Sequence, residues 1–126
     1  MPATQQDLMT ARLFFNAAFP VMQVVLDDDP QMHKKFEDVA ATVQIGARND
    51  GELVACHLVF DHGKVTVVQE PAGNADITMT FPNVAKMNTM FRGGMALPSI
   101  KGITKIGLLI KVFSLLMSLM LMMPSS

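Results

Sequence analysis

Residues 39–67 read VAATVQIGARNDGELVACHLVFDHGKVTV, and apolar and polar side chains alternate along them with a period of two. Successive side chains of an extended strand point to opposite faces, so this period predicts strands with one covered face. Residues 49–51 (Asn-Asp-Gly) and 61–63 (Asp-His-Gly) interrupt the pattern with sequences typical of tight hairpin turns. The stretch therefore predicts three strands in an antiparallel meander.

Each of these strands carries an apolar face. Its residues are Val39, Ala41, Val43, Ile45 and Ala47, then Val54, Cys56, Leu58 and Phe60, then Val65 and Val67. Residues 75–81 repeat the alternation and predict a fourth strand. Residues 103–107 are rich in β-branched side chains and follow Gly102, and they predict a fifth strand.

Helical spacing of apolar residues marks much of the remaining chain. It predicts a helix from Thr4 that Pro20 ends or kinks. Residues 21–26 and 31–37 predict two short helices, separated by three aspartates and a proline. Residues 84–91 predict another helix, which two glycines follow.

The composition limits the function. A chain of 126 residues has room for a single domain, 1–126, and its net charge of -1 gives no electrostatic footprint for nucleic acid. Half of the residues are hydrophobic, and 12 are methionine, which suits surfaces that fit several apolar shapes but also fills ordinary cores. The lone Cys56 excludes an intrachain disulfide and fits a reducing compartment. With no secretory signal at the N-terminus, we expect a cytoplasmic protein.

Residues 108–123 carry mostly large apolar side chains that water alone cannot cover. Three interpretations follow: a membrane span, a core helix of one domain or of a dimer, or a helix that lines an apolar cavity. Lys111, Ser114 and Ser118 share one helical face. This narrow polar stripe favours a helix with one edge in water and the remainder covered.

No residue set with catalytic or metal-binding spacing is visible. Cys56 and His57 are neighbours on a strand and point to opposite faces, while His33 and His62 stand apart from them. Residues 27–29 (Asp-Asp-Asp) lack the alternating ligands of a calcium loop. We therefore expect no enzymatic activity, no cofactor and no metal.

Several stretches after Asp50 follow one another in a characteristic order. They are Val54 to Phe60 followed by Asp61-His62-Gly63-Lys64-Val65 and Val67, then Ala75-Asp76-Ile77-Thr78-Met79, then Phe91-Arg92-Gly93-Gly94, then Gly102-Ile103-Thr104-Lys105-Ile106-Gly107 before a leucine-rich terminal helix. In this order and spacing the chain resembles the sterol carrier protein 2 family of lipid-binding domains. The resemblance covers about three fifths of the chain, and Leu108 stands where that family often has an aspartate.

The resemblance implies an α/β (α+β) fold, in which helices cover one side of a five-stranded, mostly antiparallel sheet and an apolar tunnel lies between the layers. It also implies non-catalytic carriage of a sterol, a fatty acyl chain, a phospholipid or an isoprenoid quinone intermediate. Candidates for the tunnel wall, which could equally be plain core, are Met79, Phe81, Met87, Met90, Phe91, Met95, Leu116 and Met120.

Arg92 and Lys101 are weaker candidates for contact with a lipid head group at the mouth of the tunnel. A carrier of this kind is expected to touch membranes transiently, and a homodimer is compatible with the apolar terminal segment. The alternative is an accessory or scaffold subunit that docks on a partner enzyme or a membrane through that segment.

Overall fold

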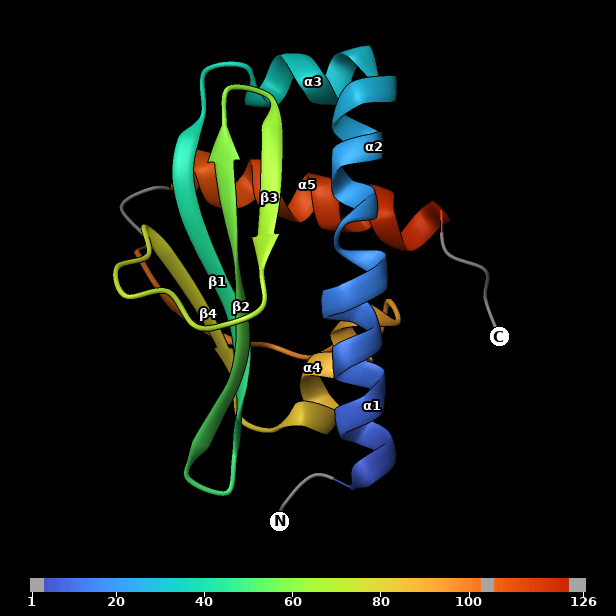
Figure 1. The fold of residues 1–126 in the computed structure, drawn as a ribbon, viewed down its shortest axis with the longest axis vertical. Helices are drawn as coiled ribbons and strands as arrows, with labels where there is room; N and C mark the ends of the chain where they lie inside the picture. The colour runs from blue at the N-terminus through green and yellow to red at the C-terminus, as the bar shows by residue number, and fades with distance from the viewer. Residues whose placement is uncertain (1–3, 103–105, 123–126) are drawn as a thin grey trace.

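The computed structural model describes residues 4–102 and 106–122, with the side chains of residues 106, 117 and 119–122 left out of the description (Figure 1). Its strands are β1 (Ala40–Asn49), β2 (Glu52–Asp61), β3 (Lys64–Val68), β4 (Ile77–Phe81) and β5 (Ser99–Lys101). Its helices are α1 (Gln5–Leu13), η1 (Phe14–Ala18), α2 (Val21–Asp28), α3 (Pro30–Phe36), α4 (Val84–Phe91) and α5 (Ile106–Met122).

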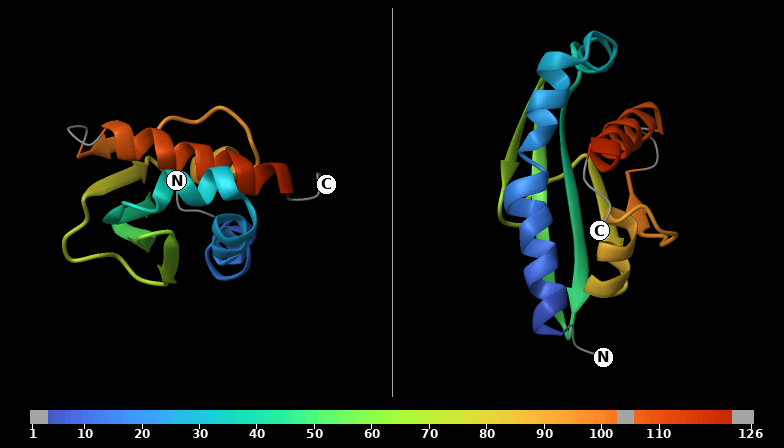
Figure 2. Two further views of the ribbon diagram at one scale, coloured as in Figure 1. Left: turned by 90° about the horizontal axis from the view of Figure 1, so that it is seen from above. Right: turned by 90° about the vertical axis from the view of Figure 1, so that its right-hand side faces the viewer.

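The strands form one mixed sheet in the order β3-β2-β1-β4-β5. β1 pairs antiparallel with β2, which pairs antiparallel with β3, so the predicted meander is confirmed. β4 pairs parallel with β1, and β5 pairs antiparallel with β4. The sheet is therefore mostly antiparallel. The helices pack against the face of the sheet whose side chains form the hydrophobic core (Figures 1 and 2).

Side chains on both faces of β1 are buried from Val43 to Ala47. The face that points away from the helices is therefore covered as well. The loop of residues 69–76 crosses that face. The backbone N–H of Ala72 donates to Oε1 of Gln44 at 2.8 Å, and the N–H of Thr42 donates to a carboxylate oxygen of Asp76 at 2.8 Å. The sequence pattern predicted one covered face and did not predict this outer cover.

α1, η1 and α2 form one helical column that runs the length of the sheet (Figure 1). Thr4 begins it with a reciprocal capping box to Asp7. Where a kink was predicted at Pro20, the chain makes a π-turn in which the N–H of Phe19 donates to the carbonyl of Phe14 at 2.7 Å. The wider turn rotates both Phe14 and Phe15 into the core.

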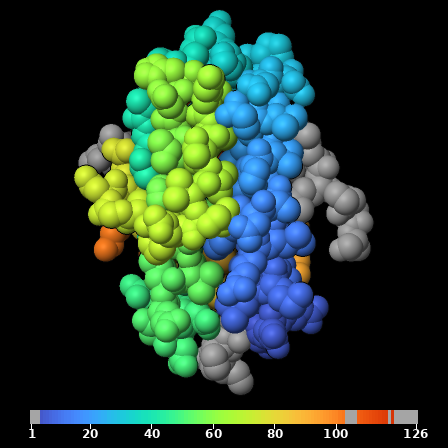
Figure 3. All heavy atoms as spheres, in the orientation of Figure 1, coloured from blue at the N-terminus to red at the C-terminus, as the bar shows by residue number. Residues whose placement is uncertain are grey.

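Two glutamines hold this column against β3, the edge strand. Oε1 of Gln23 accepts the outward N–H of Val65 at 2.6 Å, and Nε2 of Gln69 donates to the carbonyl of Phe15 at 2.6 Å. An edge strand leaves such backbone groups unpaired, so these side chains complete the sheet's hydrogen bonding. In Figure 3 the column lies side by side with β3.

The fifth strand is not where the sequence predicted it. β5 is Ser99–Lys101, Ile106 and Gly107 begin α5, and residues 103–105 lie outside the described part of the chain. Pairing with β4 places Ile100 opposite Met79, and Gly102 then leaves the sheet at a φ of 90°. That φ is natural for glycine, so Gly102, which was expected to precede the fifth strand, follows its end.

Gly46 sits where β1 and β2 approach closely. A Cβ at this position would lie 2.5 Å from Cβ of Ala55 and 2.8 Å from the carbonyl oxygen of Val54. We predict that Gly46→Ala lowers the free energy of unfolding in urea by about 2 kcal/mol, because the sheet must shift to admit the methyl group. The control Gly73→Ala, with nothing within 4 Å, should change it by less than about 0.5 kcal/mol. Equal effects of the two variants would contradict this packing.

Candidate functional site

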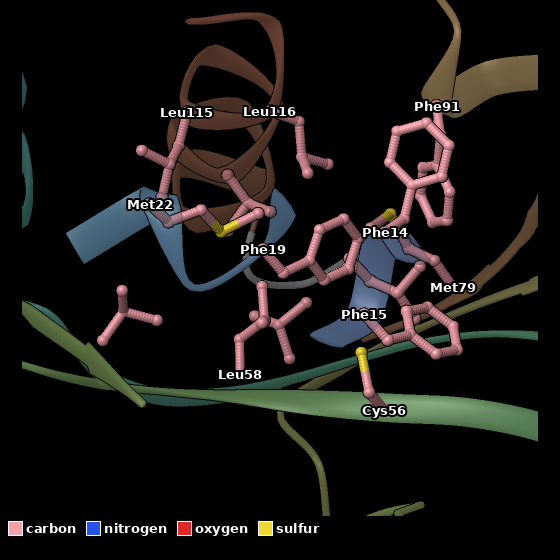
Figure 4. Packing of buried hydrophobic residues seen from close by; sticks show 14 of the residues in the cluster. Phe14, Phe15, Phe19, Met22, Cys56, Leu58, Met79, Phe91, Leu115 and Leu116 are labelled. Atoms are coloured by element: carbon pink, nitrogen blue, oxygen red, sulfur yellow. The ribbon is translucent and has the colours of Figure 1, made fainter. Parts of the chain in front are cut away.

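The candidate site is the apolar interior between the sheet and the helices. Side chains from β1, β2 and β4 meet side chains from the helical column, α4 and α5 there (Figure 4). Six of the eight predicted wall residues lie in this one cluster, each at most 8% exposed. They are Met79, Phe81, Met87, Met90, Phe91 and Leu116.

Of the other two predicted wall residues, Met95 lies apart from this cluster and Met120 lies outside the described side chains. Met95 lies in the segment after α4 with 91% of its surface exposed, because Gly93 and Gly94 end the helix before it. Met120 belongs to α5, but its side chain lies outside the described residues.

Four phenylalanines form the centre of the interior, of which only Phe91 was predicted. Its ring centroid lies 4.9 Å from that of Phe14 and 5.1 Å from that of Phe19, and Phe15 lies 5.6 Å from Phe19. These tilted and edge-on geometries are favourable for aromatic pairs. The missed signal was the density of phenylalanines in residues 14–19, where the π-turn turns neighbouring residues to one side.

Cys56 projects from β2 into this interior, toward Phe15 (Figure 4). It is fully buried, and burial raises the pKa of its thiol to about 12. Desolvation disfavours the charged thiolate among apolar neighbours. The thiol therefore stays protonated at neutral pH and behaves as a small apolar side chain, as the sequence predicted.

α5 closes the interior from the side opposite the sheet. Val112, Leu115 and Leu116 point inward and are almost fully buried, and Leu115 lies near Met22 of α2 (Figure 4). α5 packs mainly against α2 and only lightly against α3. Figure 2 shows it crossing the helical column instead of running along it. The backbone of α5 thus lies alongside α2 more than alongside α3, while its buried side chains join the core cluster.

A groove of about 540 Å³ opens between α3 and α5. One wall comes from α3 and the residue before it, and the other comes from α5. The lining residues are Asp29, Gln31, Met32, Lys35, Ile110, Phe113, Ser114 and Ser118. Ser114 and Ser118 belong to the polar stripe predicted from the sequence, and the structure places them on this edge of the helix.

The two predicted head-group residues lie elsewhere on the surface. Arg92 ends α4, where its guanidinium reaches Oγ1 of Thr10 at 3.5 Å, and Lys101 is exposed at the end of β5. Neither lines the groove between α3 and α5. Near Arg92, Asn88 is buried and donates to the carbonyl of Asp7 at 2.9 Å, which fastens α4 to α1.

The described residues offer no cluster of metal ligands and contain one long apolar helical stretch. Within them, no three histidine, cysteine or acidic side chains are grouped closely enough to hold a metal ion. One helical stretch, Gln5–Asp28, is long and apolar enough to cross a membrane by length and composition. In this structure its apolar side forms part of the core through Phe19, Met22 and Leu26.

Several solved structures of sterol carrier protein 2 and of related domains share the fold of this chain. Sterol carrier protein 2 superimposes with a TM-score of 0.63 and 16% identity, covering 82% of this chain and 94% of that one. The sterol carrier protein domain 2 of Helicoverpa armigera gives 0.62 and 15%, covering 100% and 99%. A ubiquinone synthesis protein, UbiJ-SCP2, gives 0.54 and 15%, covering 92% and 99%. No family model and no curated protein matches the sequence.

The burial of Cys56 predicts an unreactive thiol. We expect its reaction with an aromatic disulfide reagent at mildly alkaline pH to be at least about 100-fold slower than that of a Thr66→Cys variant in a Cys56→Ala background, because Thr66 is exposed. The rate is measured by thiolate release with and without denaturant. Equal rates for the two folded proteins would contradict the burial of Cys56.

Proposed function

From the sterol carrier protein 2 fold of this chain, we propose that the protein reversibly binds an apolar lipid between its sheet and its helices and carries it without covalent chemistry. The observation that carries this proposal is the large apolar cluster between the sheet and the helices, which α5 covers through Val112, Leu115 and Leu116. The ligand class is a sterol, a fatty acyl chain, a phospholipid or an isoprenoid quinone intermediate.

The methionines of the interior support exchange between protein contacts and lipid contacts. Met79, Met87 and Met90 supply unbranched, polarizable side chains from β4 and α4. Such side chains change rotamer without strain, so the same wall fits several apolar shapes. The phenylalanine rings beside them supply flat, stiff surface against which a chain or a ring system can lie.

The energetics permit such an exchange. Each methylene group removed from water contributes about 0.8 kcal/mol, so a chain of about 16 carbons gains on the order of 12 kcal/mol. Opening the interior costs part of the contacts of Val112, Leu115 and Leu116 with α2 and the core, which the incoming chain replaces.

The interior contributes no reactive group to this role. The thiol of Cys56 faces it but stays protonated, because burial raises its pKa to about 12. The proposed activity is therefore binding by burial, with the lipid leaving chemically unchanged.

Mass spectrometry of the natively purified protein tests this proposal. We predict an adduct of lipid mass that dissociates on denaturation, and a delipidated protein that takes up a fluorescent fatty acid with one-to-one stoichiometry. Thermal unfolding should shift upward with added lipid, because a ligand that binds only the folded state stabilises it. A protein that carries no lipid and binds none of the four ligand classes would refute the proposal.

A scaffold role is the second candidate, and exposed apolar side chains favour it. Met95 is 91% exposed, Leu97 83% and Ile110 61%. Large apolar side chains in water mark surfaces that other molecules cover. A protein that binds no lipid but associates with a partner enzyme or a membrane, and loses that association on Ile110→Ser, would support this role instead.

A further inference from the structure

The groove between α3 and α5 joins the protein surface to the candidate lipid site. Met32 lines the groove and is also a member of the core cluster, with 5% of its surface exposed. Phe113 lines the same groove from α5 and packs against that cluster. The floor of the groove is therefore the outer side of the apolar interior.

Polar side chains line much of the groove beside this floor, together with the exposed Ile110. Gln31 and Lys35 rise from α3, and Ser114 and Ser118 rise from α5, which is otherwise almost wholly apolar. The hydroxyl of Ser114 donates to the carbonyl of Ile110 at 3.0 Å, which leaves its oxygen as an acceptor at the groove. Polar side chains beside an apolar floor match an amphiphile whose chain points inward.

Asp29 and Lys35 bring opposite charges to the groove. The carboxylate of Asp29 already accepts the N–H groups of Gln31 at 3.0 Å and Met32 at 3.2 Å, as the N-cap of α3. Lys35 has no ion-pair partner within 4.0 Å among the residues that the structure describes. An anionic head group would complete the pairing that Lys35 lacks.

Resting on the proposed function, we infer that this groove is the mouth of the lipid site and that Lys35 binds the carboxylate of an anionic amphiphile there. The chain of that amphiphile passes beside Met32 and Phe113 into the interior when α5 separates from α3. The mouth therefore lies at a different place from Arg92 and Lys101, the residues that the sequence suggested.

Neighbouring lysines on α3 offer a matched test. Lys35 lines the groove, whereas Lys34 lines a separate pocket of about 430 Å³ with Asp27, His33 and Glu37. Both are exposed, so Lys35→Glu and Lys34→Glu change the net charge equally and leave the core intact. The probes are cis-parinaric acid and its methyl ester, which share one chain and differ in the head-group charge.

We predict that Lys35→Glu weakens binding of the acid on the order of fivefold and leaves the ester unchanged, whereas Lys34→Glu alters neither. The difference in acid affinity between Lys35→Glu and the wild type should shrink at high ionic strength, because salt screens the exposed pair of Lys35 and the carboxylate. In a second arm, Ser118→Cys labelled with a bulky maleimide should slow uptake of both probes, and labelled Lys34→Cys should not. The buried Cys56 stays unlabelled in both.

The outcomes separate the two proposals. The inference is overturned if the wild type binds both probes, Lys35→Glu and Lys34→Glu bind them equally well, and the label at position 118 does not slow uptake. The proposed function would still stand in that case. Failure of the wild type to bind either probe counts against both. The selective loss of acid binding in Lys35→Glu supports the mouth at this groove.

Discussion

The contact between α5 and α2 is the interaction on which the rest of the structure depends. Leu115 and Leu116 of α5 are almost fully buried, and Leu115 lies beside Met22, which projects from the helical column (Figure 4). Without this contact the interior between sheet and helices would face water, and a chain in which half the residues are hydrophobic would expose its core. The same contact holds α5 over the interior, because the backbone of α5 lies alongside α2 more than alongside α3.

Local patterns were sufficient to predict most of the sheet and helices. The alternation along residues 39–67 fixed which side chains face the core, since a shift of one residue would expose all of them. The turns at Gly51 and Gly63 have a positive φ, as the Asn-Asp-Gly and Asp-His-Gly sequences indicated. Period and turn chemistry are properties of neighbouring residues, so a sequence carries them directly.

What the sequence did not predict depends on contacts between distant segments. Phe14 and Phe15 both face the core because of the π-turn before Pro20, which no spacing rule for regular helices anticipates. β5 is set by its register with β4, and the groove exists because α3 and α5 diverge there. The buried residues of β4 and α4 were predictable because amphipathic elements identify their buried faces. Lys35 was not, because its neighbours across the groove come from the far end of the chain.

Methyl groups of the methionines offer the most direct test of a lipid held between the layers. With ¹³C-labelled methionine methyls, a spectrum recorded during titration with a long-chain amphiphile reports buried and exposed positions together. The account predicts shifts and ligand contacts at the buried Met79, Met87 and Met90, with Met9 and Met95, which are 66% and 91% exposed, unchanged. Shifts confined to Met9 and Met95 would contradict it, because the amphiphile would then lie on the outside of the protein.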